Sequence, residues 1–70
     1  MDQIIHEAAR LVGWIRPGER LSKNYFDSTA IHYKSLQGEF PQLSPSLMAH
    51  ELAGRLQLKV DDGAEELTLP

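Results

Sequence analysis

The sequence predicts a small, mainly helical domain of the α+β class, in which three short helices precede a C-terminal β-hairpin. Two observations support this prediction. Apolar residues recur at helical spacing in three segments that are separated by proline and glycine. From residue 56 onward, apolar and polar residues alternate on both sides of an Asp-Gly turn, which is the pattern of a hairpin. The 70 residues suffice for one domain, so we expect residues 1–70 to form a single unit.

The first helix is expected at about residues 2–15. Its first turn carries Asp2, and an acid is favourable there, whereas Pro17-Gly18 ends the helix. One apolar stripe follows the helical spacing and comprises Ile4, Ile5, Ala8, Leu11, Val12 and Ile15. Gly13 lies within this helix, where it costs about 1 kcal/mol relative to alanine. Trp14 falls on the polar side, so its ring either covers the rim of the core or anchors a partner.

The second helix is expected at about residues 22–37, with Ser22 as its N-cap and Gly38 as the residue after its end. Its buried side is predicted to be an arc of Tyr25, Phe26, Thr29, Ala30, Tyr33 and Leu36. Ile31 then stands on the solvent side of the helix. Because the β-branched and aromatic residues at 29, 31 and 33 also alternate, a strand is the alternative for this segment.

The third helix is expected at about residues 44–54. Ser44 suits the N-cap, Pro45 suits the first helical position, and Gly54 closes the helix. Its buried face is predicted to comprise Met48, Ala49, Leu52 and Ala53. Two apolar residues of the preceding connector are expected to pin that connector to the core: Phe40 and Leu43.

The hairpin is expected at about residues 56–69. Leu56, Leu58 and Val60 alternate with polar residues before the turn. Three helices followed by a hairpin is the order of a winged-helix module, so the expected fold is winged-helix-like. If no strand forms, the third helix continues towards Val60 and the fold is a plain three-helix bundle.

Size and charge favour association with polypeptides over binding to nucleic acid. A chain this small buries only about 60% of the surface of its unfolded form, and without cysteine it has no disulfide to compensate. The net charge is −3, and residues 39–70 hold six carboxylates against two Lys/Arg. Affinity for DNA depends on neutralising phosphates, which Asp61 and Asp62 at the hairpin tip would repel. Nucleic-acid binding is therefore disfavoured.

The composition also indicates a location. No apolar run approaches the roughly 20 residues that span a bilayer, and the first residues lack the basic start of a secretory signal. The absence of cysteine fits a reducing compartment. We therefore expect a soluble, cytoplasmic protein without a membrane partner.

The sequence contains no pattern that predicts catalysis. His6-Glu7 and His50-Glu51 begin the zinc motif H-E-x-x-H, but arginine and glycine occupy the places of the second histidine. Asp27 and His32 are five residues apart and do not face each other on a helix, and no nucleophile elbow accompanies them. We therefore expect no enzyme, metal, cofactor or small-molecule substrate. His32 or His50 at an interface would make association depend on pH.

These observations predict a small non-enzymatic regulatory or interaction protein. We expect an adaptor, inhibitor or modulator that binds another protein and forms a homodimer. The predicted partner-binding residues are three apolar anchors and two basic contacts: Trp14, Ile31, Tyr33, Arg16 and Arg20. The alternative is a DNA-binding transcriptional regulator of winged-helix or helix-turn-helix type, supported by the order of the predicted elements.

Overall fold

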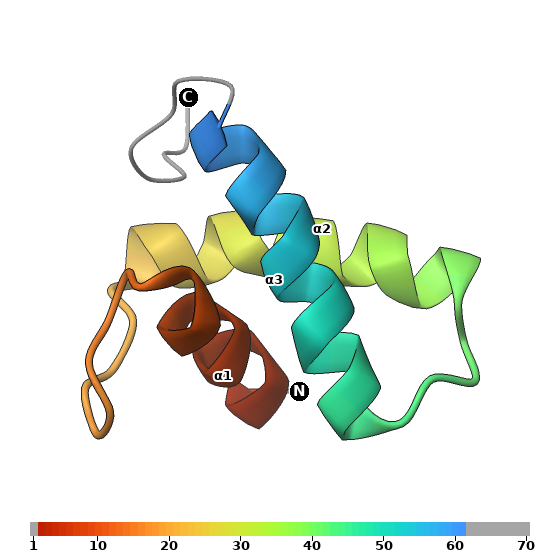
Figure 1. Ribbon diagram of the computed structural model, residues 1–70, viewed down its shortest axis with the longest axis horizontal. Helices are drawn as coiled ribbons and strands as arrows, with labels where there is room; N and C mark the ends of the chain where they lie inside the picture. Colours follow the sequence, from red (N-terminus) through yellow and green to blue (C-terminus); the bar gives the residue numbers. More distant parts are fainter. Residues whose placement is uncertain (1, 62–70) are drawn as a thin grey trace.

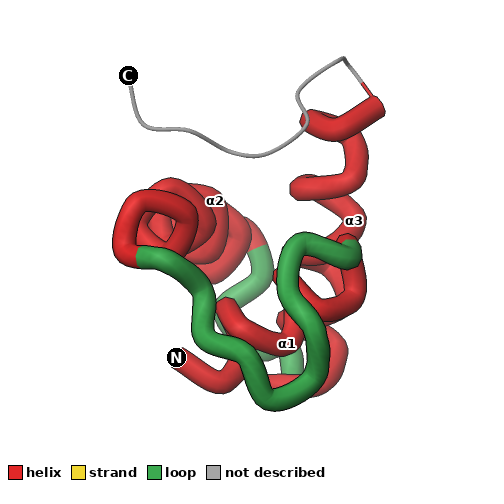
Figure 2. The backbone as a smooth tube through the Cα atoms, turned by 90° about the vertical axis from the view of Figure 1, so that its left-hand side faces the viewer, coloured by secondary structure: helices red, strands yellow, loops and turns green. Residues whose placement is uncertain are grey.

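A computed structural model describes residues 2–61, and over this range the chain forms three α-helices (Figure 1). They are α1 (Asp2–Val12), α2 (Lys23–Glu39) and α3 (Pro45–Asp61). α3 runs across α2, and α1 lies beside the first half of α3 (Figure 1). The view in Figure 2 places α2 at one side of the fold and α3 at the other. This is the plain three-helix alternative, with no strand within residues 2–61.

The prediction of a hairpin that begins at residue 56 is wrong, because α3 continues through residues 56–61. Leu56 extends the helical register of the buried face and is fully buried, whereas Leu58 is 64% exposed. A strand would have placed both side chains on one face. Burial at helical spacing therefore outweighs the local alternation. The Asp-Gly turn and the second expected strand lie outside the described residues.

α1 ends three residues earlier than expected, because Gly13 terminates it. Gly13 has a φ of +93°, a left-handed conformation that favours glycine. The Trp14 backbone N–H donates to the Ala9 carbonyl at 2.9 Å, and the Gly13 backbone N–H donates to the Arg10 carbonyl at 3.0 Å. These two hydrogen bonds form a Schellman motif. Trp14 therefore follows the helix, and its predicted place on the polar side of a longer helix is wrong.

Serine caps begin the other two helices, as predicted. The Ser22 hydroxyl accepts a long hydrogen bond of 3.5 Å from the Tyr25 N–H, and the Ser44 hydroxyl accepts one of 3.3 Å from the Leu47 N–H. Each cap satisfies a backbone donor that has no partner inside the helix. At its C-terminal end α2 passes through Gly38, which was expected to follow the helix, and ends at Glu39.

The core lies where the three helices meet. It comprises Ile5, Ala8, Ala9, Leu21, Tyr33, Leu36, Met48, Leu52, Ala53 and Leu56. Thr29 is also fully buried, and its hydroxyl donates to the Tyr25 carbonyl at 2.6 Å. Of the two predicted connector pins, Leu43 packs against this core, whereas Phe40 is 47% exposed. The Phe40 side chain therefore does not pin the connector.

Candidate interaction surface

The solvent-facing side of α3 carries two large apolar side chains. Leu47 is 55% exposed and Leu58 is 64% exposed. Because these leucines are separated by about three helical turns, they lie on one line along the helix. Between them on this line lie the exposed residues Glu51 and Gly54. We call Leu47, Glu51, Gly54 and Leu58 the outer stripe; it is opposite the face that contributes to the core.

Gly54 leaves the middle of the outer stripe without a side chain. A Cβ atom built at Gly54 would meet nothing within 4 Å, so no packing contact within the described chain requires glycine there. Glycine in a helix interior costs about 1 kcal/mol relative to alanine. The residue therefore opens a shallow gap between the two leucines, where another backbone can approach closely.

Charged and polar residues border the outer stripe. Arg55 forms an ion pair with Glu39 of α2, which ties the second half of α3 to the end of α2. Towards the C-terminal end of α3, the Gln57 amide donates to the Asp61 carboxylate at 3.1 Å. Near its start, the His50 ring Nδ1 lies 2.9 Å from the Ser46 carbonyl oxygen. The stripe thus resembles an interface core with a polar rim.

The outer side of α2 presents Ile31, which is 61% exposed and was predicted to face solvent. Lys23 and Asp27, which precede it on the same helix, form an ion pair at 2.9 Å. His32, the next residue, lies partly buried on the side of α2 near α3. This burial lowers the pKa of His32, and the charges of Lys59 and Arg55 lower it further. His32 is therefore held in its neutral form more firmly than an exposed histidine.

The structure places the two predicted aromatic anchors within or against the core. Tyr33 is 5% exposed, because it lies two residues from Ile31 and so points to the opposite side of α2. The partly buried Trp14 packs against the core, with its ring centroid 6.4 Å from that of Tyr25. The buried Trp14 Nε1 has no hydrogen-bond partner among the described residues. Neither ring is placed beside Ile31 on an outer face.

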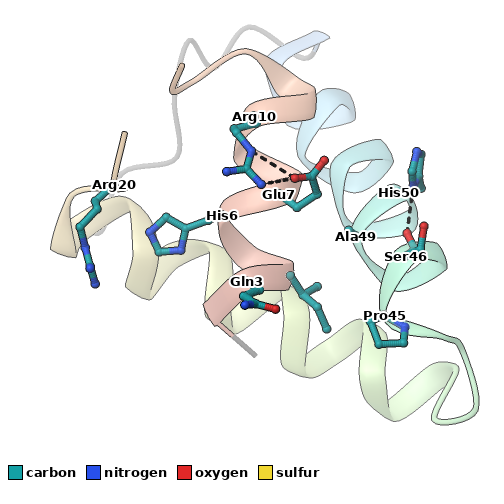
Figure 3. Close-up of a pocket in the computed structure, with 10 residues that line it drawn as sticks. Gln3, His6, Glu7, Arg10, Arg20, Pro45, Ser46, Ala49 and His50 are labelled. Carbon is teal, nitrogen blue, oxygen red and sulfur yellow. Dashed lines mark hydrogen bonds and ion pairs between the residues drawn. The ribbon is translucent and has the colours of Figure 1, made fainter. Parts of the chain in front are cut away.

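Both predicted basic contacts are exposed and lie in or near the loop between α1 and α2. The Arg16 backbone N–H donates to a Glu19 carboxylate oxygen at 2.7 Å, so this contact shapes the loop and leaves the Arg16 side chain at the surface. Arg20 lies at one end of an open depression that is lined mainly by α1 and the start of α3 (Figure 3). Only Arg20 of the five predicted residues belongs to this depression.

The depression has a volume of about 730 Å³, and both polar and apolar side chains line it. Figure 3 shows His6 beside Arg20 at one end and Ser46 with His50 on α3 at the other. Between them, the Arg10 Nε donates to Glu7 at 3.1 Å, so the guanidinium is neutralised by its own helix. The His6 ring lies against Phe26, with centroids 5.7 Å apart.

Sequence reasoning missed the outer stripe of α3. Ending the third helix at Gly54 and assigning Leu58 to a strand separated that leucine from Leu47. The alternative prediction of a longer third helix would have revealed this stripe. In such a helix, the 11 residues between Leu47 and Leu58 correspond to about three turns and place both leucines on the side opposite Leu52 and Leu56.

No protein family, curated protein or solved structure significantly matches this chain. None of the helices within residues 2–61 combines the length and the apolar character needed to cross a membrane. Over the same range, no three His, Asp or Glu side chains are grouped so that they could hold a metal ion. Large apolar side chains are exposed on all three helices, namely Leu11, Ile31, Leu47 and Leu58.

Proposed function

We propose that this protein is a small non-enzymatic regulatory or interaction protein that binds other polypeptides. The observation that carries the proposal is the exposure of Ile31, Leu47 and Leu58, which lie on the sides of α2 and α3 that face away from the core. More than half of the surface of each side chain is in contact with water, and a bound partner would cover it. Burying a large aliphatic side chain contributes about 1.5–3 kcal/mol, which makes such residues effective anchors.

The pairing of side chains that line the depression supports a non-enzymatic role. Among the side chains that line the depression, Arg10 forms an ion pair with Glu7, and the His50 ring is hydrogen-bonded to the Ser46 backbone carbonyl. Such internal pairing leaves few groups to polarise a substrate or to move a proton. The lack of cysteine fits the reducing cytoplasm, which we propose as the location of the protein.

The DNA-binding alternative receives less support from the same surface. An exposed recognition helix needs Arg, Lys, Asn or Gln near its start to contact bases and phosphates. The first two turns of α3 expose Ser46, Leu47, His50 and Glu51 instead. The first arginine on α3, Arg55, is paired with Glu39. Loss of the expected hairpin also removes the structural basis for a wing within the described residues.

Capture from lysate of the native host, with matched variants, tests the proposal. The immobilised protein is expected to retain a specific polypeptide that the Ile31→Asp variant loses by at least tenfold. Gln37→Asp places the same charge at an exposed polar position of α2 and should retain the partner. If both variants retain or lose the partner equally, or if only a salt-dependent gel shift with DNA is observed, the proposal is wrong.

A further inference from the structure

The outer stripe of α3 has a spacing that reads the same in both directions. Its four residues follow one another at intervals of four, three and four. When two such helices lie antiparallel, Leu47 of each copy comes opposite Leu58 of the other. Glu51 then comes opposite Gly54. A surface that is complementary to itself under a two-fold rotation is what a symmetric dimer requires.

We propose that the outer stripe is the contact surface of a homodimer in which two α3 helices pack antiparallel. This inference rests on the proposed function as an interaction protein and names a second copy of the chain as the partner of α3. A second copy is the expected partner because the outer stripe pairs with itself and because the charges around it are complementary in that pair.

The glycine supports close packing of the two helices. Gly54 has open space around its missing Cβ, so the described chain gains no internal contact from the lack of a side chain. In the antiparallel pair, the stem of Glu51 from the second copy lies over this bare backbone. Glu51 of each copy thereby fills the gap at Gly54 of the other copy. The leucines at both ends of the two stripes can then meet.

The charges favour the antiparallel direction over the parallel one. Arg55 lies one residue beyond Gly54, on the flank of α3 that also carries Glu51, so the antiparallel pair brings Glu51 beside Arg55 of the second copy. Arg55 uses one guanidinium nitrogen, Nη2, in its ion pair with Glu39 of its own chain, and its other N–H donors can serve Glu51. Asp61 at the C-terminal end comes beside Ser46 at the start of the other helix, where a carboxylate is favourable. A parallel pair would instead place each carboxylate beside its own counterpart, which is repulsive.

The size of the surface predicts a weak dimer. A helix of 17 residues is about 25 Å long, so two such helices bury less than the roughly 1,600 Å² of a standard interface. We therefore expect dissociation constants on the order of micromolar or weaker, with monomer and dimer in exchange. Equilibrium sedimentation over a wide concentration range will measure this dissociation constant.

Disulfide trapping tests the direction of the helices, because the natural chain has no cysteine. Mixing Leu47→Cys with Leu58→Cys under a thiol redox buffer should give a covalent dimer in at least tenfold excess over either variant alone. In the antiparallel pair, two copies of position 47 are about 16 Å apart along the axis, whereas a disulfide needs Cα atoms within about 7 Å. Leu47→Cys mixed with Ile31→Cys controls for random collision. Cross-linking of Leu47→Cys with itself, or no excess over the control, would overturn the proposal.

A glycine substitution gives an independent measurement. The Cβ atom added by Gly54→Leu has open space in the monomer and leucine is a good helix former, but the substitution places a side chain where the two backbones meet. We expect it to weaken the dimer by more than tenfold in sedimentation while leaving the helical content intact. Gly38→Leu makes the same change at an equally open glycine of α2 and should leave the dimer unchanged. Equal dimer affinity in both variants would contradict the proposed contact.

These experiments separate the inference from the proposed function. If the cysteine pair does not cross-link but Ile31→Asp still abolishes capture of a partner, the dimer is wrong and the interaction role stands. If the cross-link forms and no Ile31-dependent partner is found, the dimer stands and the binding of other proteins is wrong.

Discussion

Replacing Leu56 and Leu58 separately by alanine tests the length of α3 directly. Leu56 is fully buried, and truncating a buried leucine to alanine costs about 2–5 kcal/mol. Leu58 is 64% exposed, so its truncation should change the free energy of unfolding by less than about 0.5 kcal/mol. A hairpin would give the two changes similar costs, because alternate residues of a strand share a face.

The size of the chain makes this contrast easy to measure. A 70-residue domain is expected to have about 4–10 kcal/mol of stability, so loss of the Leu56 side chain removes a large fraction of it. Urea unfolding followed by circular dichroism gives both free energies, at protein concentrations low enough to avoid self-association. Equal destabilisation by the two substitutions would show that residues 56–61 do not have the helical arrangement described above.

Three further predictions concern stability. The Ser28 hydroxyl is buried without a hydrogen-bond partner among the described residues. Ser28→Ala should therefore stabilise the protein by about 1 kcal/mol more than Ser35→Ala on the exposed side of α2, as measured by urea unfolding. Equal effects of the two substitutions would mean that the Ser28 hydroxyl has a partner. Gly13→Ala should destabilise the protein by about 1–2 kcal/mol because φ at Gly13 is positive. Gly38→Ala lies within a helix and should stabilise the protein by up to about 1 kcal/mol. Melting temperatures that shift in the same direction for both variants would refute this prediction. Because burial, more than the nearby charges of α3, lowers the pKa of His32, the unfolded chain takes up this proton first. Stability should therefore fall as the pH drops below about 6.5 and through the lower pKa of the folded state. His32→Gln should flatten that part of the melting temperature profile, and an unchanged slope would exclude His32 as its cause.

The sequence by itself determined where the helices begin and which residues form most of the core. Ser22 and Ser44 cap α2 and α3 because a serine hydroxyl satisfies a local backbone donor, and this needs no tertiary contact. Apolar residues at helical spacing likewise identified most of the buried face of each helix. The solvent-facing position of Ile31 followed from the same spacing. These features depend on neighbours within one or two turns.

Only the tertiary structure decided where the helices end and which apolar side chains besides Ile31 remain at the surface. Gly13 stops α1, whereas Gly54 lies within α3, although both are glycines flanked by helix-forming segments. The local cost of about 1 kcal/mol for Gly54 is smaller than the roughly 1.5–3 kcal/mol gained by burying Leu56 in the core. Such a comparison requires the packed neighbours. For the same reason, Trp14 was assigned to a helix face that does not exist, and the outer stripe emerged only once α3 was seen to continue to Asp61.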